Sequence, residues 1–286
     1  MRKHAYLIIA HNNFYVLEKL IRLIDDERND IYIHIDKKVK DFDFLKYKSI
    51  CKKSKLLFLK KRYNVRWGHS SLVKAEMCLF ENAYIGGEYE YYHLLSCSDL
   101  PIRNQDYIHK FFEQNKYEFI EFAPIYDSIY EFRISKYHFN MSNKILKKFE
   151  PILELIQYKL KINRIKNSGF KIYKGSEWAS LSNEFVKYLL KNKKNILKYT
   201  RFSLCADEIY KQTLAMNSKF ASKIYPKKDI RLIDWERHEG ESPHVFTIDD
   251  YDFIMNSECL FVRKFVESRD RDIIDKIYER VLNDAQ

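Results

Sequence analysis

Residues that interrupt or cross-link a chain are scarce in this sequence. Among 286 residues there are six glycines, five prolines and five cysteines. No glycine-rich or proline-rich linker is present, and the apolar pattern resumes after every turn, which favours a single domain, 1–286. The cysteines are odd in number and lack a Cys-x-x-Cys spacing, which argues against a disulfide framework and a structural zinc. We therefore expect a reducing, cytoplasmic setting.

Long hydrophobic runs are absent as well. The first apolar run, 5–10, is too short for a signal peptide or a membrane span. No later stretch is long enough to cross a bilayer. The length still allows a sizeable core.

Acidic residues are fewer than basic ones, and the formal net charge is +11. Such a charge suits nucleic acid, an anionic membrane surface or a phosphorylated ligand. Lys, Asn, Ile, Tyr and Phe are abundant together while Gly and Pro are scarce, a joint bias that A/T-rich codons alone produce. The charge is therefore weak evidence about partners. A non-enzymatic module that binds nucleic acid or another polyanion stays open as an alternative, although no recognised nucleic-acid motif supports it.

Short apolar runs alternate with helical periodicity along the chain. This alternation predicts an α/β fold whose largely parallel sheet is flanked by helices. A helix is expected where Leu17, Leu20, Ile21 and Ile24 recur at helical spacing, and a second one at 70–84. The expected strands are 5–10, 30–36, 56–59, 91–96 and 117–122.

Polar residues follow three of these strands. His11, Asp36 and Asp99 come at or just after a strand end. Each is a plausible turn former or helix start when taken singly. Because the carboxyl ends of parallel strands meet at one edge, where ligands bind, the three are expected to converge. The Asp36 carboxylate would accept hydrogen bonds from the uracil or ribose of a nucleotide.

The strand that leads to Asp99 lacks a second acid. A nucleotide-sugar transferase would normally present an Asp-x-Asp metal site there, but Cys97 occupies the other position. A lone carboxylate is a poor chelate for a hard divalent cation. If the chain transfers sugars, another group must neutralise the diphosphate.

The second half of the sequence supplies such groups. Arg263 and Lys264 lie between apolar residues, and together they offer a diphosphate forked donors and a point charge. The alternative is two cations that snorkel at the edge of a core strand. Glu208 follows Asp207 at the start of an expected helix, where it would accept a proton from an attacking hydroxyl. The alternative is an acid that stabilises the helix dipole.

A metal-dependent transferase is a second alternative. The segment Asp234-Trp235-Glu236 contains a pair of acids that would hold the metal. The position of this segment favours a strand near Arg263 and Lys264 rather than a metal site.

The segment 144–166 has the pattern of an amphipathic helix. Apolar residues recur at helical spacing among lysines and an arginine, which is compatible with lying on an anionic bilayer. The alternative is a helix that faces the core and has a solvated basic side. Pro151 interrupts the pattern.

The order of these motifs resembles the core-2/I-branching β-1,6-N-acetylglucosaminyltransferase family, which also contains the peptide O-xylosyltransferases. The resemblance covers nearly the whole chain. The matching segments are 7–11, 33–36, 65–68, 94–103, 175–178, 207–208 with Thr213, and 261–265.

This resemblance implies a GT-A type, Rossmann-like fold and an inverting, metal-independent transfer of a sugar. N-acetylglucosamine is the first expectation for the sugar, moved from a UDP-sugar to a glycan or lipid-linked saccharide, with no nucleic-acid partner. It also implies a nucleotide-binding half, 1–125, and an acceptor and catalytic half, 126–286. By the same resemblance Glu208 is the general base. The UDP would contact His11, Asp36, Arg263 and Lys264, and the substrates would contact Glu177, Trp178, Asp99 and Trp67.

The sequence departs from the family pattern at two places near these residues. Cys97 stands where a glycine is usual, and Val262 stands where an alanine is usual. The paired cysteines of the animal enzymes are missing. We expect a bacterial, cytoplasmic version that works at the inner face of the membrane, with peripheral contact to it.

Overall fold

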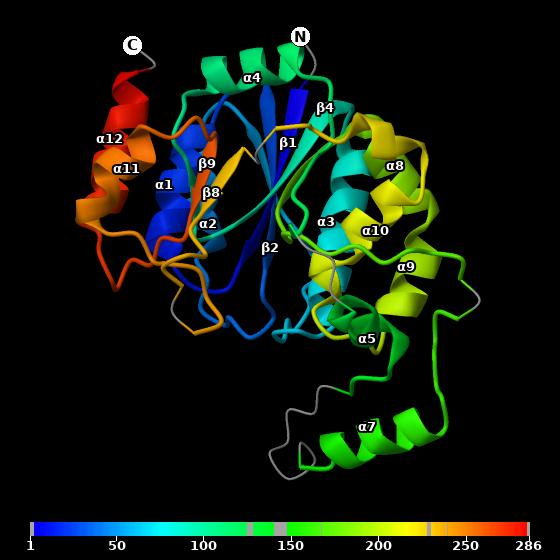
Figure 1. The fold of residues 1–286 in the computed structure, drawn as a ribbon. Helices are drawn as coiled ribbons and strands as arrows, with labels where there is room; N and C mark the ends of the chain where they lie inside the picture. Colours follow the sequence, from blue (N-terminus) through cyan, green and yellow to red (C-terminus); the bar gives the residue numbers. More distant parts are fainter. Residues whose placement is uncertain are drawn as a thin grey trace.

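The computed structural model describes residues 3–124, 128–139, 148–166, 168–227, 230–238 and 240–284. Its centre is a six-stranded sheet with the strand order β3-β2-β1-β4-β7-β6 (Figure 1). The strands β1 (Lys3–Ala10), β2 (Asn29–Ile35), β3 (Lys55–Phe58) and β4 (Tyr89–Ser96) are parallel to one another. Strand β7 (Ala179–Ser182) is antiparallel to both of its neighbours, β4 and β6 (Phe119–Ile120). The predicted α/β architecture with a mixed, mostly parallel sheet flanked by helices is confirmed.

Helices cover both faces of this sheet. Alternate residues of β1 belong to two different hydrophobic clusters, because successive side chains point to opposite faces. One cluster includes α1 (Phe14–Ile24), α4 (Gln105–Gln114) and α12 (Asp272–Asn283), and the other includes α3 (Ser71–Gly86) and α8 (Asn183–Lys191). Every residue of β2 is therefore buried, as expected for a parallel strand between two helical layers.

Both helices predicted from the sequence are present. In α1 the predicted apolar positions Leu17, Leu20, Ile21 and Ile24 are all buried. The second predicted helix, 70–84, corresponds to α3. Among the described residues the other helices are α2 (Phe44–Ile50), α5 (Ile129–Ser135), α7 (Glu150–Lys159), α9 (Lys193–Thr200), α10 (Tyr210–Met216) and α11 (Tyr251–Met255), with short 3-10 turns η1 (Ala206–Glu208), η2 (Lys219–Lys223) and η3 (Ile248–Asp250).

A second sheet of three short strands joins the two halves of the sequence. Its order is β5 (Asp99–Pro101), β9 (Phe261–Arg263) and β8 (Arg231–Ile233). Asp99 lies opposite Arg263 in the antiparallel pair β5 and β9. Asp99, a plausible turn former by sequence, thus begins an edge strand. The proposed division at residue 125 stays a prediction, and strands from both sides of it pair with one another.

Three predicted elements are wrong in detail. The strand expected at 117–122 is only β6, because it pairs with β7 over two residues while Glu118 forms an isolated bridge with Ile224. The helix expected from residue 207 begins as the 3-10 turn η1 and becomes α-helical at Tyr210. The strand expected at 234–236 ends at Ile233, because the Asp234 carboxylate accepts the next backbone N–H groups and forms a turn.

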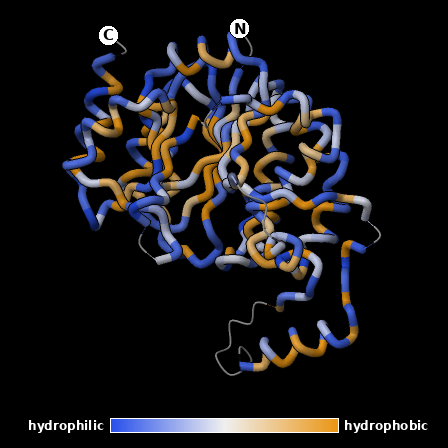
Figure 2. Tube along the Cα trace, viewed as in Figure 1, coloured by the Kyte–Doolittle hydropathy of each residue, from blue (hydrophilic) through white to orange (hydrophobic). Residues whose placement is uncertain are grey.

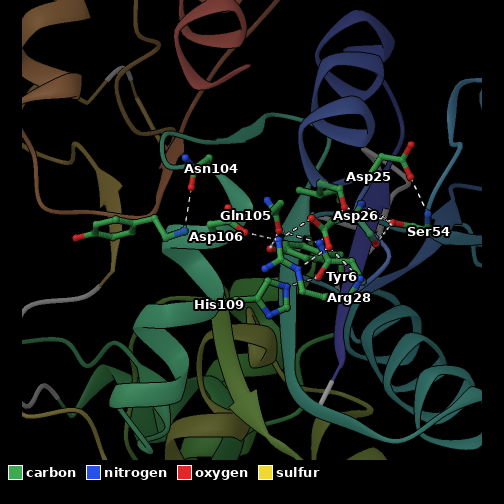
Figure 3. A network of polar contacts seen from close by, with 12 residues as sticks. Tyr6, Asp25, Asp26, Arg28, Ser54, Asn104, Gln105, Asp106 and His109 are labelled. Carbon is green, nitrogen blue, oxygen red and sulfur yellow. Dashed lines mark hydrogen bonds and ion pairs between the residues drawn. The ribbon is translucent and has the colours of Figure 1, made fainter. Parts of the chain in front are cut away.

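The amino ends of the strands are closed by a polar network with α4 (Figure 3). Gln105 Oε1 accepts hydrogen bonds from Tyr6 Oη at 3.0 Å and from Asn29 Nδ2 at 2.8 Å. His109 Nε2 lies 3.0 Å from Asn29 Oδ1, and burial lowers the pKa of His109 to about 4. Arg28 joins Asp26 and Asp106 beside it. This edge of the sheet is occupied by the protein's own side chains, so a ligand site is to be sought at the opposite edge.

Helix α7 lies apart from the rest of the molecule, beyond α5 (Figure 1). The first part of the helix predicted at 144–166, residues 144–147, lies outside the described residues. Pro151 lies in the first turn of α7, where a missing N–H is tolerated, so it does not interrupt the helix. In the described part of the chain, no helix combines the length and the apolar character needed to cross a bilayer.

Candidate active site

The predicted site residues lie at the carboxyl edge of the parallel strands. His11 follows β1, Asp36 follows β2, and Asp99 comes shortly after β4. Strand β7 runs antiparallel to β4, with Ser180 opposite His93. The residues that precede β7, Glu177 and Trp178, therefore lie at the same edge.

Asp99 holds Arg263 in place. Arg263 Nη1 donates to Asp99 Oδ1 and to Ser96 Oγ, each at 2.8 Å. Asp99 also accepts the Ser96 backbone N–H at 2.6 Å, and it is only 2% exposed. The guanidinium lies over the Trp178 ring, 4.4 Å from its centre. The lone carboxylate of this strand end thus anchors a cation, and the buried indole forms the floor beneath that cation.

Lys264 lies beside Arg263 and is also held. Its Nζ donates to Ser242 Oγ at 2.9 Å. Burial, together with the neighbouring Arg263, lowers the pKa of Lys264. A cation that is desolvated and next to another cation gains most from an added anion. The pair is therefore suited to receive a diphosphate.

His11 lies near this pair and also near Asp36. Asp36 Oδ1 accepts the Lys38 backbone N–H at 2.7 Å, and Oδ2 accepts the Val65 N–H at 3.1 Å. The carboxylate is buried and fastens the end of β2 to the following loop. Partial burial lowers the pKa of His11, with Asp36 opposing the shift and Lys264 adding to it. His11 is thus in electrostatic contact with both predicted UDP-binding regions.

Glu208 ends the turn η1 and has one oxygen available. Its Oε2 lies 2.9 Å from Arg133 Nη1 and 3.2 Å from Lys174 Nζ. Among the described residues no donor contacts Oε1. The side chain is 29% exposed. Two cations therefore orient the carboxylate through one oxygen, and the other is able to accept a proton.

A close backbone contact connects Glu208 with the segment of Glu177 and Trp178. The Gly175 N–H donates to the Glu208 carbonyl oxygen at 2.9 Å. A Cβ on Gly175 would lie 1.7 Å from the Glu121 carbonyl oxygen, so only glycine fits. This glycine keeps the predicted base and the predicted sugar-contacting pair at a constant separation.

Glu177 interacts electrostatically with two buried acids, Glu76 and Asp207. Lys211 Nζ lies 2.7 Å from Glu76 Oε2, and both side chains are fully buried. Burial, with the neighbouring acids, raises the pKa of Asp207 to about 7 and raises that of Glu177 well above its ordinary value. Glu177 Oε1 and Asp207 Oδ1 are buried without a hydrogen-bond partner in the described part of the chain. Burial and the mutual repulsion of the three acids disfavour their charged forms, while Lys211 and, for Glu177, Arg263 oppose this effect.

Trp67 lies in a loop that packs beside the turn of Glu208. The Gly68 carbonyl oxygen accepts the Cys205 N–H at 2.9 Å, directly before η1. Gly68 has a φ of 65°, a conformation that favours glycine. The Trp67 side chain is 66% exposed, so it is accessible to a ligand.

Lys174 also lines a pocket of about 480 Å³. Its lining includes the aromatic residues Phe122, Tyr130, Tyr173 and Tyr225. Aromatic side chains of this kind offer apolar faces with polar edges, which suits sugar rings. Because Lys174 also contacts Glu208, the pocket adjoins the predicted base.

The candidate residues form a connected group. Arg263 contacts Asp99 and Trp178, and it interacts electrostatically with Glu177 and His11. Among the described residues no three His, Cys, Asp or Glu side chains are arranged to hold a metal ion.

Comparison with known proteins bears on what this group does. A family model described as Core-2/I-Branching enzyme matches residues 4–254. The chain belongs to the Core-2/I-branching enzyme family.

Two curated relatives of this family member show the range of its similarity. It is 31% identical over 119 residues to the β-glucuronosyltransferase GlcAT14B of Arabidopsis thaliana, covering 40% of this chain and 27% of that protein. It is 22% identical over 277 residues to the xylosyltransferase oxt of Drosophila pseudoobscura pseudoobscura, covering 87% of this chain and 30% of that protein. The chain thus spans less than a third of the length of either relative. A solved structure, the WbbM bifunctional glycosyltransferase in its apo form, aligns over 99% of this chain and 52% of that chain with a TM-score of 0.47 and 10% identity.

Several residues of this candidate site were not predicted from the sequence. Arg133 and Lys174 orient Glu208, and Glu76 with Lys211 forms the buried ion pair below it. A signal was present for Glu76, which is an acid within the apolar run of α3. Nothing in the local sequence indicated that Arg133 or Lys174 would meet Glu208.

Proposed function

We propose that this family member transfers a sugar from a UDP-sugar to a hydroxyl of a glycan or lipid-linked saccharide, with inversion and without a metal. The observation that supports this best is the pair Arg263 and Lys264, held at the sheet edge where the second acid of an Asp-x-Asp site is absent. Fixed cations at this place would neutralise the negative charge of the diphosphate, as a divalent ion does in metal-dependent enzymes.

The proposed reaction is a single displacement. Glu208 Oε1 takes the proton of the acceptor hydroxyl, and the hydroxyl oxygen bonds to the anomeric carbon of the donor. The bond from that carbon to the β-phosphate oxygen breaks, and UDP leaves with the electron pair. Negative charge grows on the β-phosphate as it leaves, so Arg263 and Lys264 stabilise the transition state more than the bound donor.

The remaining residues are proposed to bind the two substrates. Asp36 and His11 would contact the uridine, where the Asp36 oxygens retain lone pairs for further hydrogen bonds. Glu177, whose pKa is raised by burial and by the neighbouring acids, would form a hydrogen bond with a sugar hydroxyl beside Trp178. N-acetylglucosamine is the proposed donor sugar. The relatives named for glucuronosyl and xylosyl transfer make those two UDP-sugars necessary comparisons.

A donor assay tests the proposal. We expect the protein to release UDP from one UDP-sugar of a panel that contains N-acetylglucosamine, xylose, glucose, galactose and glucuronate. The rate should be the same in excess chelator, because the counter-charge is supplied by side chains. GDP-mannose serves as the control donor and should not react. Loss of activity in chelator, with recovery on adding Mg²⁺ or Mn²⁺, would favour a metal-dependent transferase.

The pocket beside Lys174 is proposed to bind the acceptor. Replacing Tyr173 by Ala should raise the KM for the acceptor about tenfold, since an aromatic contact of about 1–1.5 kcal/mol is lost. The KM for the donor should stay unchanged. Tyr107→Ala, at an exposed position on α4 near the opposite edge, is the control. An unchanged acceptor KM in Tyr173→Ala would remove the pocket from the proposal.

A further inference from the structure

Helix α7 exposes an apolar stripe. Phe149, Ile152, Ile156 and Leu160 are separated by three or four residues, so they share one face of the helix. Their exposed fractions are 51%, 53%, 45% and 67%. Figure 2 shows hydrophobic residues along α7, outside the body of the molecule. The alternative of a core-facing helix with a solvated basic side is wrong, because these apolar side chains do not reach the core.

Polar contacts hold this helix to the rest of the chain. Gln157 is the buried residue of α7, and its amide exchanges hydrogen bonds with the Tyr137 backbone at 2.7 and 3.0 Å. Arg164 donates to the Lys136 carbonyl oxygen at 3.1 Å and lies over the Tyr137 ring. The apolar stripe is therefore not what attaches α7, and it is available for another surface.

Exposed lysines lie in α7 and next to it along the chain, and they outnumber the exposed acid Glu154. Lys148, Lys159, Lys161 and Lys166 are all exposed, while Arg164 is used in the attachment. A stripe of aliphatic and aromatic side chains bordered by flexible cations complements an anionic lipid surface, because the stripe enters the boundary of the acyl chains while the cations meet the headgroups. We propose that α7 docks this protein on an anionic phospholipid bilayer.

The position of α7 relates this docking to the candidate active site. The Arg164 N–H donates to the Ser135 carbonyl oxygen at 2.9 Å, and Ser135 ends α5. Helix α5 also carries Arg133, which contacts Glu208. Helix α5 therefore connects the segment that follows α7 with Glu208. A bilayer bound to α7 would lie on this side of the molecule. The docking itself does not depend on the proposed sugar transfer.

Vesicle flotation with the full chain tests the inference. We expect binding to phosphatidylcholine vesicles that contain about 30 mol% phosphatidylglycerol, and about tenfold weaker binding to phosphatidylcholine alone. Raising the salt to about 0.5 M should weaken binding, because it screens the lysines. The double variant Ile152→Ser, Ile156→Ser should lose binding by about tenfold or more. The double variant Lys159→Gln, Lys161→Gln should lose the preference for the anionic vesicles.

A matched control distinguishes binding through α7 from nonspecific binding through other exposed apolar residues. Leu45 and Ile85 are 79% and 80% exposed on α2 and α3, and Leu45→Ser with Ile85→Ser should bind vesicles as the unchanged protein does. Circular dichroism should show the same Tm for all variants. Equal binding by the Ile152 and Ile156 variant would overturn the inference. Absence of vesicle binding by the unchanged protein would also overturn it. If that protein elutes as a dimer and the Ile152 and Ile156 variant elutes as a monomer, a second copy of the chain covers the stripe.

Discussion

Replacing Glu208 by Gln is expected to lower kcat about a thousandfold while the Kd for UDP stays within a factor of two to three. The amide keeps the size of the side chain and the contacts of one oxygen with Arg133 and Lys174, but it cannot accept the proton of the acceptor hydroxyl. Turnover with the identified donor and acceptor, and calorimetry with UDP, measure the two quantities.

The adjacent acid provides the matched control for this prediction. Asp207 is buried, and burial raises its pKa to about 7, so Asp207→Asn replaces a group that is already partly protonated at neutral pH. We expect this variant to fold and to retain most of its turnover. Normal turnover in Glu208→Gln together with its loss in Asp207→Asn would transfer the role of base to Asp207.

Removing both Arg263 and Lys264 is expected to weaken UDP binding about a hundredfold or more, while the affinity for uridine stays nearly unchanged. Each cation offers the diphosphate charge-assisted hydrogen bonds of about 1.5–3 kcal/mol, and uridine has no phosphate to receive them. Asp36→Asn is the opposite control, because it should weaken uridine and UDP equally. Calorimetry with both ligands measures the contrast. Equal losses for uridine and UDP in the Arg263 and Lys264 variant would contradict a diphosphate clamp.

Arg263 also has a structural partner that must be considered in this experiment. Arg263→Ala leaves the buried Asp99 carboxylate without its cation, which costs about 3–5 kcal/mol of stability. Lys264→Ala leaves that ion pair intact and should by itself weaken UDP about tenfold. Adding Asp99→Asn to Arg263→Ala should restore the Tm without restoring UDP affinity. The two effects are therefore separable.

Much of the framework was predictable because its signals are local. The strands β1, β2 and β4 are buried apolar runs, and α1 repeats its apolar residues at helical spacing. These patterns predict parallel strands, and parallel strands place His11 and Asp36 at one edge. The edge strand β6 was overestimated, because its extent depends on how far β7 lies alongside it.

The site was predictable only in outline. The sequence indicated that Asp99 lacks a second acid, but its partner Arg263 is 164 positions away. The buried acids were harder still, since Glu76 meets Lys211 across 135 positions, and the pKa values of Asp207 and Glu177 are raised by burial and by neighbouring acids that only the packed structure brings together. Helix α7 is a similar case, because the same amphipathic pattern suits a core-facing helix and a surface one.

The amino-acid sequence alone determined the types of the main elements, the edge of the sheet that carries polar residues and the family resemblance. Residue spacing is enough for these, because hydrophobic periodicity acts within one element. The tertiary structure decided which charges meet: Asp99 with Arg263, Glu208 with Arg133 and Lys174, and Glu76 with Lys211. Such pairings depend on burial and on distances between remote segments, and these exist only once the sheet and its helices have packed.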